Sequence, residues 1–344
     1  MGSRTGLDAQ IGFAAETVVG TAVTPTRFHE FLSESLEWTP TWLESGGLRM
    51  GSIFKRASRI VQSRKTVAGS ISLEHATKGM GLLWAHALGS TGVPVVIGAT
   101  TAYKQIHTPG SRYGKSLTVQ VGRPDPTSGL TVPHTYSGCK ISSWTFSVSD
   151  GEVAQFSIDV DGWDETLATA LATASYPAGA GLFNFSQVTA FTTGGTASTA
   201  SGETSVAGGD AVPGVVKKFE VKGDTSLDTE RFGLGNAGVK SEQLENGIST
   251  ITGSLDAEFD RATFYDVYKS GATTALHLTL AGGEIGTSGE DDTIDIILPA
   301  VKIKKATPSV SGPDVIQATV EFEAYDDETN PVIQVTLISS DSAL

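Results

Sequence analysis

The chain has 344 residues, of which 24 are basic and 38 acidic, giving a formal net charge of −14. A surface of this sign does not bind nucleic-acid phosphates by neutralising them, although it can let nucleic acid pass without sticking. The single cysteine, Cys139, excludes an intramolecular disulfide framework and a cysteine-based zinc site. No apolar stretch reaches the length of a membrane span, about 18 residues, and no basic-then-apolar leader opens the chain. We expect a soluble protein made in the cytoplasm, without membrane contact.

Residues 1–30, rich in Gly, Ala and Thr, are interpreted as an N-terminal arm. Residues 31–166 are predicted to form a first β domain, because apolar and polar residues alternate along several of its segments. Apolar side chains at helical spacing predict one amphipathic helix over Gly79–Leu88, closed by Gly89. The strands expected in this domain are Thr66–Glu74, Ser116–Val121, Lys140–Val148 and Glu152–Asp161.

Residues 167–214 are predicted to be a linker or an exposed hairpin, because Thr192–Gly209 is nearly all Gly, Ser, Thr and Ala and cannot bury a core. Residues 215–344 are then predicted to form a second β domain, with its helix over Ala262–Lys269. Its expected strands are Lys217–Lys222, Ser249–Phe259, Ala275–Leu280, Thr293–Leu298, Val301–Val310 and Val315–Tyr325.

The two predicted domains repeat one another. Thr66–Glu74 returns as Thr250–Glu258, and Val153–Asp164 returns as Val315–Asp326, with order, polarity and alternation kept. The offset is 184 residues at the first match and 162 at the second, so the first copy carries 22 extra residues after its helix, around Gly92–Arg112. A duplicated β domain without a catalytic constellation indicates a building block of a symmetric assembly rather than an enzyme.

Carboxylates recur on equivalent strand faces of both copies. Because neighbouring carboxylates on one sheet face repel each other, such a face needs solvent or a function. Two interpretations stay open, a merely solvated outer face or the acidic wall of a water-filled lumen. An acid pair for glycoside cleavage is disfavoured, because no aromatic platform accompanies it. The residues expected to face a lumen are Asp159, Asp161, Glu321 and Glu323, followed by Glu74, Asp256 and Glu258.

Each copy also carries a glycine-rich loop before its first well-matched strand. The stretch Gly233–Gly238 has the spelling of a dinucleotide fingerprint, but no apolar strand precedes it and no buried helix follows. Long loops in compact domains usually carry a function, and here we favour contact with another subunit. The candidate contact residues are Gly46, Gly47, Arg49 and Gly51 in the first loop and Phe232, Gly233, Gly235 and Gly238 in the second. No nucleophile elbow, phosphate loop or metal-hydrolase motif is present, so neither a cofactor nor a metal is expected.

The N-terminal segment carries a resemblance to a known family. Gly6–Phe28 contains a Gln-Ile-Gly segment and then Glu, Gly-Thr and Pro-Thr at characteristic spacing, and Glu34–Leu36 follows as Glu-Ser-Leu. In this it resembles the tail tube proteins of long-tailed bacteriophages. Residues of this chain that match the family pattern are Glu16, Gly20, Thr21, Pro25 and Thr26.

The resemblance implies a mainly β fold of two tandem β-sandwich tail-tube domains, each with one flanking α-helix, assembling into a β-barrel ring. It implies a structural virion protein, made in the host cytoplasm, whose stacked rings conduct DNA without binding it. The usual ring is sixfold, so two domains per chain favour a trimeric ring, with a hexameric ring as the alternative. A tape measure protein and terminator or tip proteins of the tail are the other implied partners. The competing hypothesis from another class is a secreted adhesion or carbohydrate-binding module.

Overall fold

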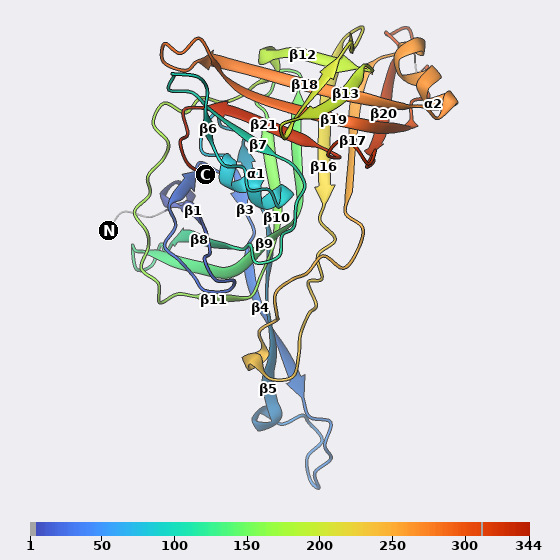
Figure 1. Ribbon diagram of the computed structural model, residues 1–344. Coiled ribbons are helices and arrows are strands. Elements are labelled where there is room, and N and C mark those ends of the chain that lie inside the picture. Colours follow the sequence, from blue (N-terminus) through green and yellow to red (C-terminus); the bar gives the residue numbers. More distant parts are fainter. Residues whose placement is uncertain (1–4, 311) are drawn as a thin grey trace.

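The computed structural model describes residues 5–310 and 312–344, and the fold is mainly β. Nineteen strands of the described chain form one hydrogen-bonded network in which the pairings are antiparallel (Figure 1). Strands β13 (Thr196–Ala200) and β14 (Glu203–Ala207) form a separate hairpin. Within the described residues, no helix is long and apolar enough to cross a membrane.

One sheet runs through both halves of the chain, and we call it the spanning sheet. Its order across the molecule is β3/β4, β5, β10, β9, β16, β17, β20 and the last part of β19. The junction between the halves is therefore the pairing of β9 with β16. The bounds are β3 (Ser33–Glu34), β4 (Glu37–Glu44), β5 (Ile60–Glu74), β9 (Thr131–Ser149), β10 (Gln155–Gly162), β16 (Val216–Asp224), β17 (Thr250–Glu258), β19 (Asp291–Lys305) and β20 (Gln317–Ala324).

The remaining strands pack as outer layers, and the same order of pairings occurs in each half. In the first half β1, β8, β9 and β11 are successive neighbours, and in the second half β12, β18, β19 and β21 are. Each long strand, β9 or β19, takes part in both an outer layer and the spanning sheet. The bounds are β1 (Gln10–Ala15), β2 (Arg27–His29), β6 (Val95–Val96), β7 (Tyr103–His107), β8 (Leu117–Pro124), β11 (Asp164–Thr166), β12 (Val188–Thr193), β15 (Asp210–Ala211), β18 (Thr273–Glu284) and β21 (Gln334–Ser339).

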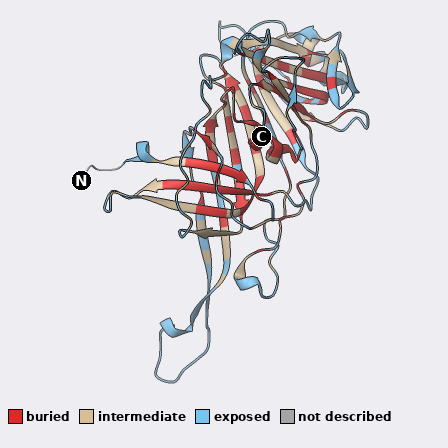
Figure 2. Ribbon diagram, turned by 60° about the vertical axis from the view of Figure 1, so that its left-hand side comes forward, coloured by how far each residue is buried: buried red, intermediate tan, exposed pale blue. Residues whose placement is uncertain are grey.

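The apolar faces of these layers enclose the core (Figure 2). Helix α1 (Gly81–Leu88) buries Trp84 against Trp144 and Phe156, with ring centroids 5.2 and 4.5 Å apart. The helix ends where Gly89 adopts φ of 73°, a left-handed conformation that glycine adopts without strain. In the second half, Phe219 stacks on Phe322 at 6.1 Å. Apolar burial of this kind contributes about 25 cal/mol per Å² of area removed from water.

The second helical segment begins at Asp260, whose side chain accepts a 2.7 Å hydrogen bond from the backbone N–H of Thr263. It consists of a π-helical turn, η5 (Arg261–Tyr265), and α2 (Asp266–Ser270). Four short turns complete the structure, η1 (Gly6–Asp8), η2 (Ala57–Arg59), η3 (Phe185–Gln187) and η4 (Asn236–Gly238).

Several strands extend further than the alternation of side chains indicated. The strand expected over Thr66–Glu74 is the last part of β5, whose beginning lies in a hairpin outside the core. The two strands expected over Thr293–Leu298 and Val301–Val310 are one strand, β19, which ends at Lys305. It continues past Pro299 because the register shifts there, between the pairs that Leu298 and Val301 form with β18.

Part of the predicted arm is folded into the body, because residues 10–15 form β1, residues 27–29 form β2, and Ile11 and Phe13 are fully buried. Between the halves, β12 pairs with β18 and β15 pairs with β12. The strand β7 lies in the 22-residue insertion of the first half and pairs with β21 of the second. Together with the β9–β16 pairing, the β7–β21 pairing is a second connection between the halves.

Candidate functional site: a polar sheet face, its edges and its loops

One face of the spanning sheet is polar from edge to edge. Side chains on this face alternate with the buried ones, and registered neighbours share the face because a strand has a period of two. Hydroxyl side chains predominate in the first half and charged ones in the second. One register row across the eight strands contains Ser33, Ser72, Ser157, Thr145, Lys222, Thr252, Glu323 and Lys302.

Six of the seven carboxylates expected on one face are accessible on this polar face. They occur at alternate positions of β5, β10, β17 and β20, and none of them is buried. Asp159 and Glu321 are exposed, and the others are partly exposed. The six residues are Glu74, Asp159, Asp256, Glu258, Glu321 and Glu323.

Lysines on the same face moderate its negative charge. The Lys305 ammonium lies 2.7 Å from a Glu321 carboxylate oxygen, and that of Lys304 lies 3.0 Å from Glu323. The Tyr325 hydroxyl donates a 2.6 Å hydrogen bond to Glu323, and this bond, with Lys304, lowers the pKa of that carboxyl. These groups are solvated, so the pairs contribute little to stability. The face is therefore hydroxyl-rich with interspersed charges, rather than uniformly acidic.

Asp161 is the exception among the seven. Its carboxylate is buried, and it accepts hydrogen bonds from the Lys240 ammonium at 2.7 and 2.9 Å and from the Gln243 amide at 2.8 Å. Burial raises the pKa of Asp161, while Lys240 and then Gln243 act to lower it. The loop of residues 225–249 thus covers the end of the polar face, so Asp161 is not available to a lumen.

A second buried cation lies under the same loop. The Lys140 ammonium donates to a Glu242 carboxylate oxygen at 2.7 Å and to the carbonyls of Arg112 and Gln243 at 2.9 Å each. Burial lowers the pKa of Lys140, and Glu242 opposes that effect. The loop is consequently fixed to the first half by two ion pairs, each with a buried ammonium group. Sequence patterns did not indicate these pairs, because their members are far apart along the chain.

The first glycine-rich loop belongs to a long hairpin that projects from the body. Strands β4 and β5 continue beyond the core, and residues 45–59 connect them (Figures 1 and 2). The candidates Gly46, Gly47, Arg49 and Gly51 lie in this exposed tip. The tip also presents apolar side chains that the sequence analysis did not single out, although they form a dense run. These are Leu48, Met50, Ile53 and Phe54, each more than 80% exposed.

The second glycine-rich loop leaves the spanning sheet on the same side but lies against β5. The Arg64 guanidinium stacks over Phe232 at 4.7 Å, close enough for a cation–π contact. Gly238 has no room for a side chain, because a Cβ there would lie 1.9 Å from the carbonyl oxygen of Ser63. Gly233 and Gly235 lie at the exposed end of the loop, beside Leu234. The two loops thus differ, since one is free-standing and the other docked.

The spanning sheet has one strand edge at each side. On one side, β3 and β4 pair with β5 alone. On the other side, the β19–β20 ladder ends at the pair Lys305 and Glu321, although the corresponding β9–β10 ladder continues to Ser147 and Gln155. Open edges of this kind are templates for pairing with another chain.

These observations define a mainly β protein with an extended polar sheet face, an exposed hairpin tip and open strand edges. Among the described residues, no group of three or more His, Cys, Asp or Glu side chains is placed to hold a metal ion. The chain belongs to the phage tail tube protein family, whose defining pattern matches residues 6–324. It is therefore a structural protein of the virion tail, which polymerises and is not an enzyme. No curated protein matches the chain.

Proposed function

We propose that the polar face of the spanning sheet lines the DNA conduit of the tail tube. The observation that carries this proposal is an eight-strand sheet with one continuous polar face and an open edge at each side. Around a central axis, such sheets can join edge to edge into a closed barrel, which removes the exposed edges. The apolar face then stays in the protein wall, and the polar face meets the water in the channel.

Each ring contains three chains, each contributing two tube domains, residues 31–166 and 215–344. The repeated order of strand pairings supports this equivalence, since the β9–β16 junction joins the halves as neighbouring subunits of a sixfold ring would be joined. Under the alternative, six chains form each ring and one half of the chain lies outside the barrel. A tape measure protein inside the tube and terminator or tip proteins at its ends are the remaining partners.

The charge of the conduit keeps DNA mobile. Its six carboxylates repel phosphates over a Debye length of about 8–10 Å. Lys304 and Lys305 are paired with carboxylates, which weakens their attraction for DNA, while Lys222 and Lys302 of the same face are exposed. The hydroxyl groups of the first half add a neutral, hydrated wall. DNA is thus a passing cargo and not a bound ligand.

The exposed tip of the β4–β5 hairpin, with Arg49 and its glycines, contacts the next ring. The residues of the second loop, Gly233 and Gly235, extend in the same direction and contribute at the rim, while Phe232 and Gly238 hold that loop in place. Four exposed apolar side chains on one projecting tip would be costly in solution and favour burial against another subunit.

Electron microscopy of the concentrated, purified protein tests the tube, and hollow striated filaments are expected. In phage, lysine substitution of the six carboxylates should slow DNA ejection, whereas lysine at Glu284 and Asp291 on the outer layer should not. Ejection at the unmodified rate from tubes with the basic face would overturn the electrostatic part of the proposal. A chain that stays monomeric under all conditions would overturn the tube itself.

A further inference from the structure

The β9–β16 junction inside the chain shows how two tube-like halves join, so it can be used as a template for the junction between chains. Register across it is fixed by seven pairs, from Ser149 opposite Lys218 to Ser143 opposite Asp224. The strand β19 corresponds to β9 and carries the same irregularity. The ladder of β10 skips Ser142, the residue of β9 just before Ser143, and that of β20 skips Lys304, the residue of β19 just before Lys305.

The edge formed by β3 and β4 can be aligned with β16, because β3 and β4 pair with β5 as β16 pairs with the equivalent strand β17. In the second half Glu220 of β16 lies opposite Ser254 of β17. In the first half the equivalent of Ser254 is Ser70, and the N–H of Ser35 donates a 2.9 Å hydrogen bond to its carbonyl. Residues of β3 and β4 thus correspond to those of β16, with Ser35 in the place of Glu220.

We infer that the segment after β19 of one chain pairs antiparallel with β3/β4 of the next chain, in the register set by the β9–β16 junction. This inference rests on the proposed ring and specifies its subunit contact. The predicted pairs are Glu34 with Val310, Ser35 with Ser309, Leu36 with Pro308, Glu37 with Thr307, Trp38 with Ala306 and Thr39 with Lys305.

Side-chain sizes agree with this register. In the internal junction Trp144 lies opposite Gly223, where a Cβ would come within 2.5 Å of the indole nitrogen. In the predicted junction the large residue, Trp38, is on the strand that corresponds to β16, and the small residue, Ala306, is on the strand that corresponds to β9. Both pairs place one indole and one small residue at the same point of the seam, as close packing requires.

The position of Pro308 agrees as well. Its counterpart in the internal junction is Phe146, which lies opposite Val221. Hydrogen-bonded and non-hydrogen-bonded pairs alternate along an antiparallel ladder. The backbone N–H of Asp150 donates to the carbonyl of Lys217, and that of Thr225 to the carbonyl of Ser142, so Phe146 and Val221 form a hydrogen-bonded pair. Proline has no N–H to offer to the carbonyl of Leu36. That carbonyl already accepts hydrogen bonds from Arg123 at 2.6 Å and Tyr136 at 3.2 Å. The proline therefore lies opposite the carbonyl that needs no donor.

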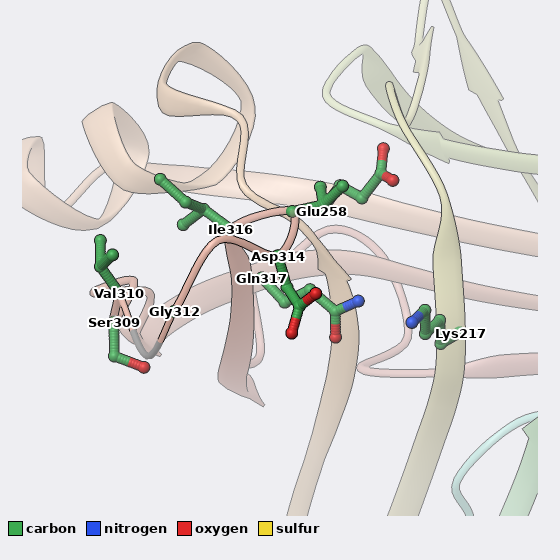
Figure 3. A pocket seen from close by; sticks show the side chains of 9 residues that line it. Lys217, Glu258, Ser309, Val310, Gly312, Asp314, Ile316 and Gln317 are labelled. Carbon is green, nitrogen blue, oxygen red and sulfur yellow. The ribbon is translucent and has the colours of Figure 1, made fainter.

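The isolated chain leaves the segment Ala306–Val310 outside the ladder of the spanning sheet. A hollow of about 450 Å³ borders Ser309, Val310 and Gln317, with Lys217 and Glu258 on its far side (Figure 3). In the first half, the corresponding space is closed by the paired ends of β9 and β10. Pairing with the next chain would complete the strand and supply the missing backbone partners.

Cysteine cross-linking in assembled tubes tests the register. Ser35 and Ser309 are exposed, and their pair corresponds to Glu220 and Ser147, a non-hydrogen-bonded pair whose Cα separation of about 4.5 Å suits a disulfide. The variant Ser35→Cys/Ser309→Cys should form a disulfide between chains on mild oxidation. The matched off-register variant, Ser35→Cys/Thr307→Cys, should form at least tenfold less. Cys139 is fully buried and adds no background.

The in-chain variant Ser147→Cys/Glu220→Cys serves as the positive control, because its disulfide is expected within one chain. Tubes in which the off-register pair links better, or in which neither pair links, would overturn the register and leave the tube function intact. If the unmodified chain forms no tubes, the proposed function fails first, and the register fails with it.

Discussion

Asp161 and Lys240 illustrate how one residue pair fixes a loop. Both are buried, and their oxygen and nitrogen atoms lie 2.7 Å apart. A buried ion pair need not add net stability, but removing one partner leaves an uncompensated charge. Lys240→Met should therefore lower the free energy of unfolding at pH 7 by about 3–5 kcal/mol, measured by urea denaturation. The matched exposed pair gives the control, since Lys305→Met should cost under about 1 kcal/mol. Equal effects of the two variants would contradict this account.

His75 is predicted to make the fold sensitive to acid. It lies fully buried among Trp84, Phe146, Phe156 and Phe183, and burial lowers its pKa from 6.5 to about 3. The folded pKa is below the unfolded one, so the contribution of the neutral ring is complete above pH 6.5 and is lost as the pH falls toward 3. The expected slope is up to about 1.4 kcal/mol per pH unit.

Replacing the ionisable ring tests this dependence. His75→Phe should flatten the decline in unfolding free energy between pH 6 and pH 4, followed by urea titrations at each pH. It should also lower stability near pH 7, because the indole N–H of Trp84 loses the acceptor it now contacts at 2.9 Å. An unchanged slope in the variant would show that other groups cause the acid response, among them His29 and His107, whose pKa values burial lowers to about 4 and about 3.

At the scale of elements, the β4–β5 hairpin should separate folding from polymerisation. Substituting its apolar tip with serine, at Leu48, Met50, Ile53 and Phe54, removes no core contact, because these side chains are exposed. Thermal unfolding should therefore shift by only a few degrees, while electron microscopy should show rings that no longer stack into tubes. Serine at the exposed residues Val93 and Val95 is the control and should leave tubes intact. Tubes of normal length from the tip variant would exclude the hairpin as the ring contact.

The sequence predicts an element well when the contacts that determine it come from residues nearby in the chain. The helix expected over Gly79–Leu88 is observed as α1, because its apolar spacing and the closing Gly89 are local features. The alternation along β10 correctly places Asp159 and Asp161 on one face, yet only Asp159 is exposed. What covers Asp161 is a loop residue, Lys240, and no periodicity within β10 can report it. The same holds for the fit of Gly223 under Trp144 across the internal junction.

At the scale of the whole molecule, the halves form one continuous unit. The β9–β16 pairing joins them in the spanning sheet, and the β7–β21 pairing joins them in the outer layer. The second pairing uses the insertion, which the second half lacks. In the proposed ring, the junction between chains would therefore rely on the spanning sheet and on side-chain contacts alone. Under this proposal the chain, rather than the domain, is the unit that assembles.

The number of chains per ring follows from closure and can be counted covalently. In Ser35→Cys/Ser309→Cys tubes, each chain carries one substituted position on each of its two edges, so disulfides link neighbours until the ring closes. If the two halves are equivalent, closure needs three chains of 35.8 kDa, and exhaustive oxidation should end at a three-chain species on a denaturing, non-reducing gel. Partial oxidation should give one-, two- and three-chain bands and none above. A ladder that continues to six chains would instead contradict closure at three chains. In the alternative ring, in which one half of each chain lies outside the barrel, the edges that carry Ser35 and Ser309 would not meet and no linked species should form.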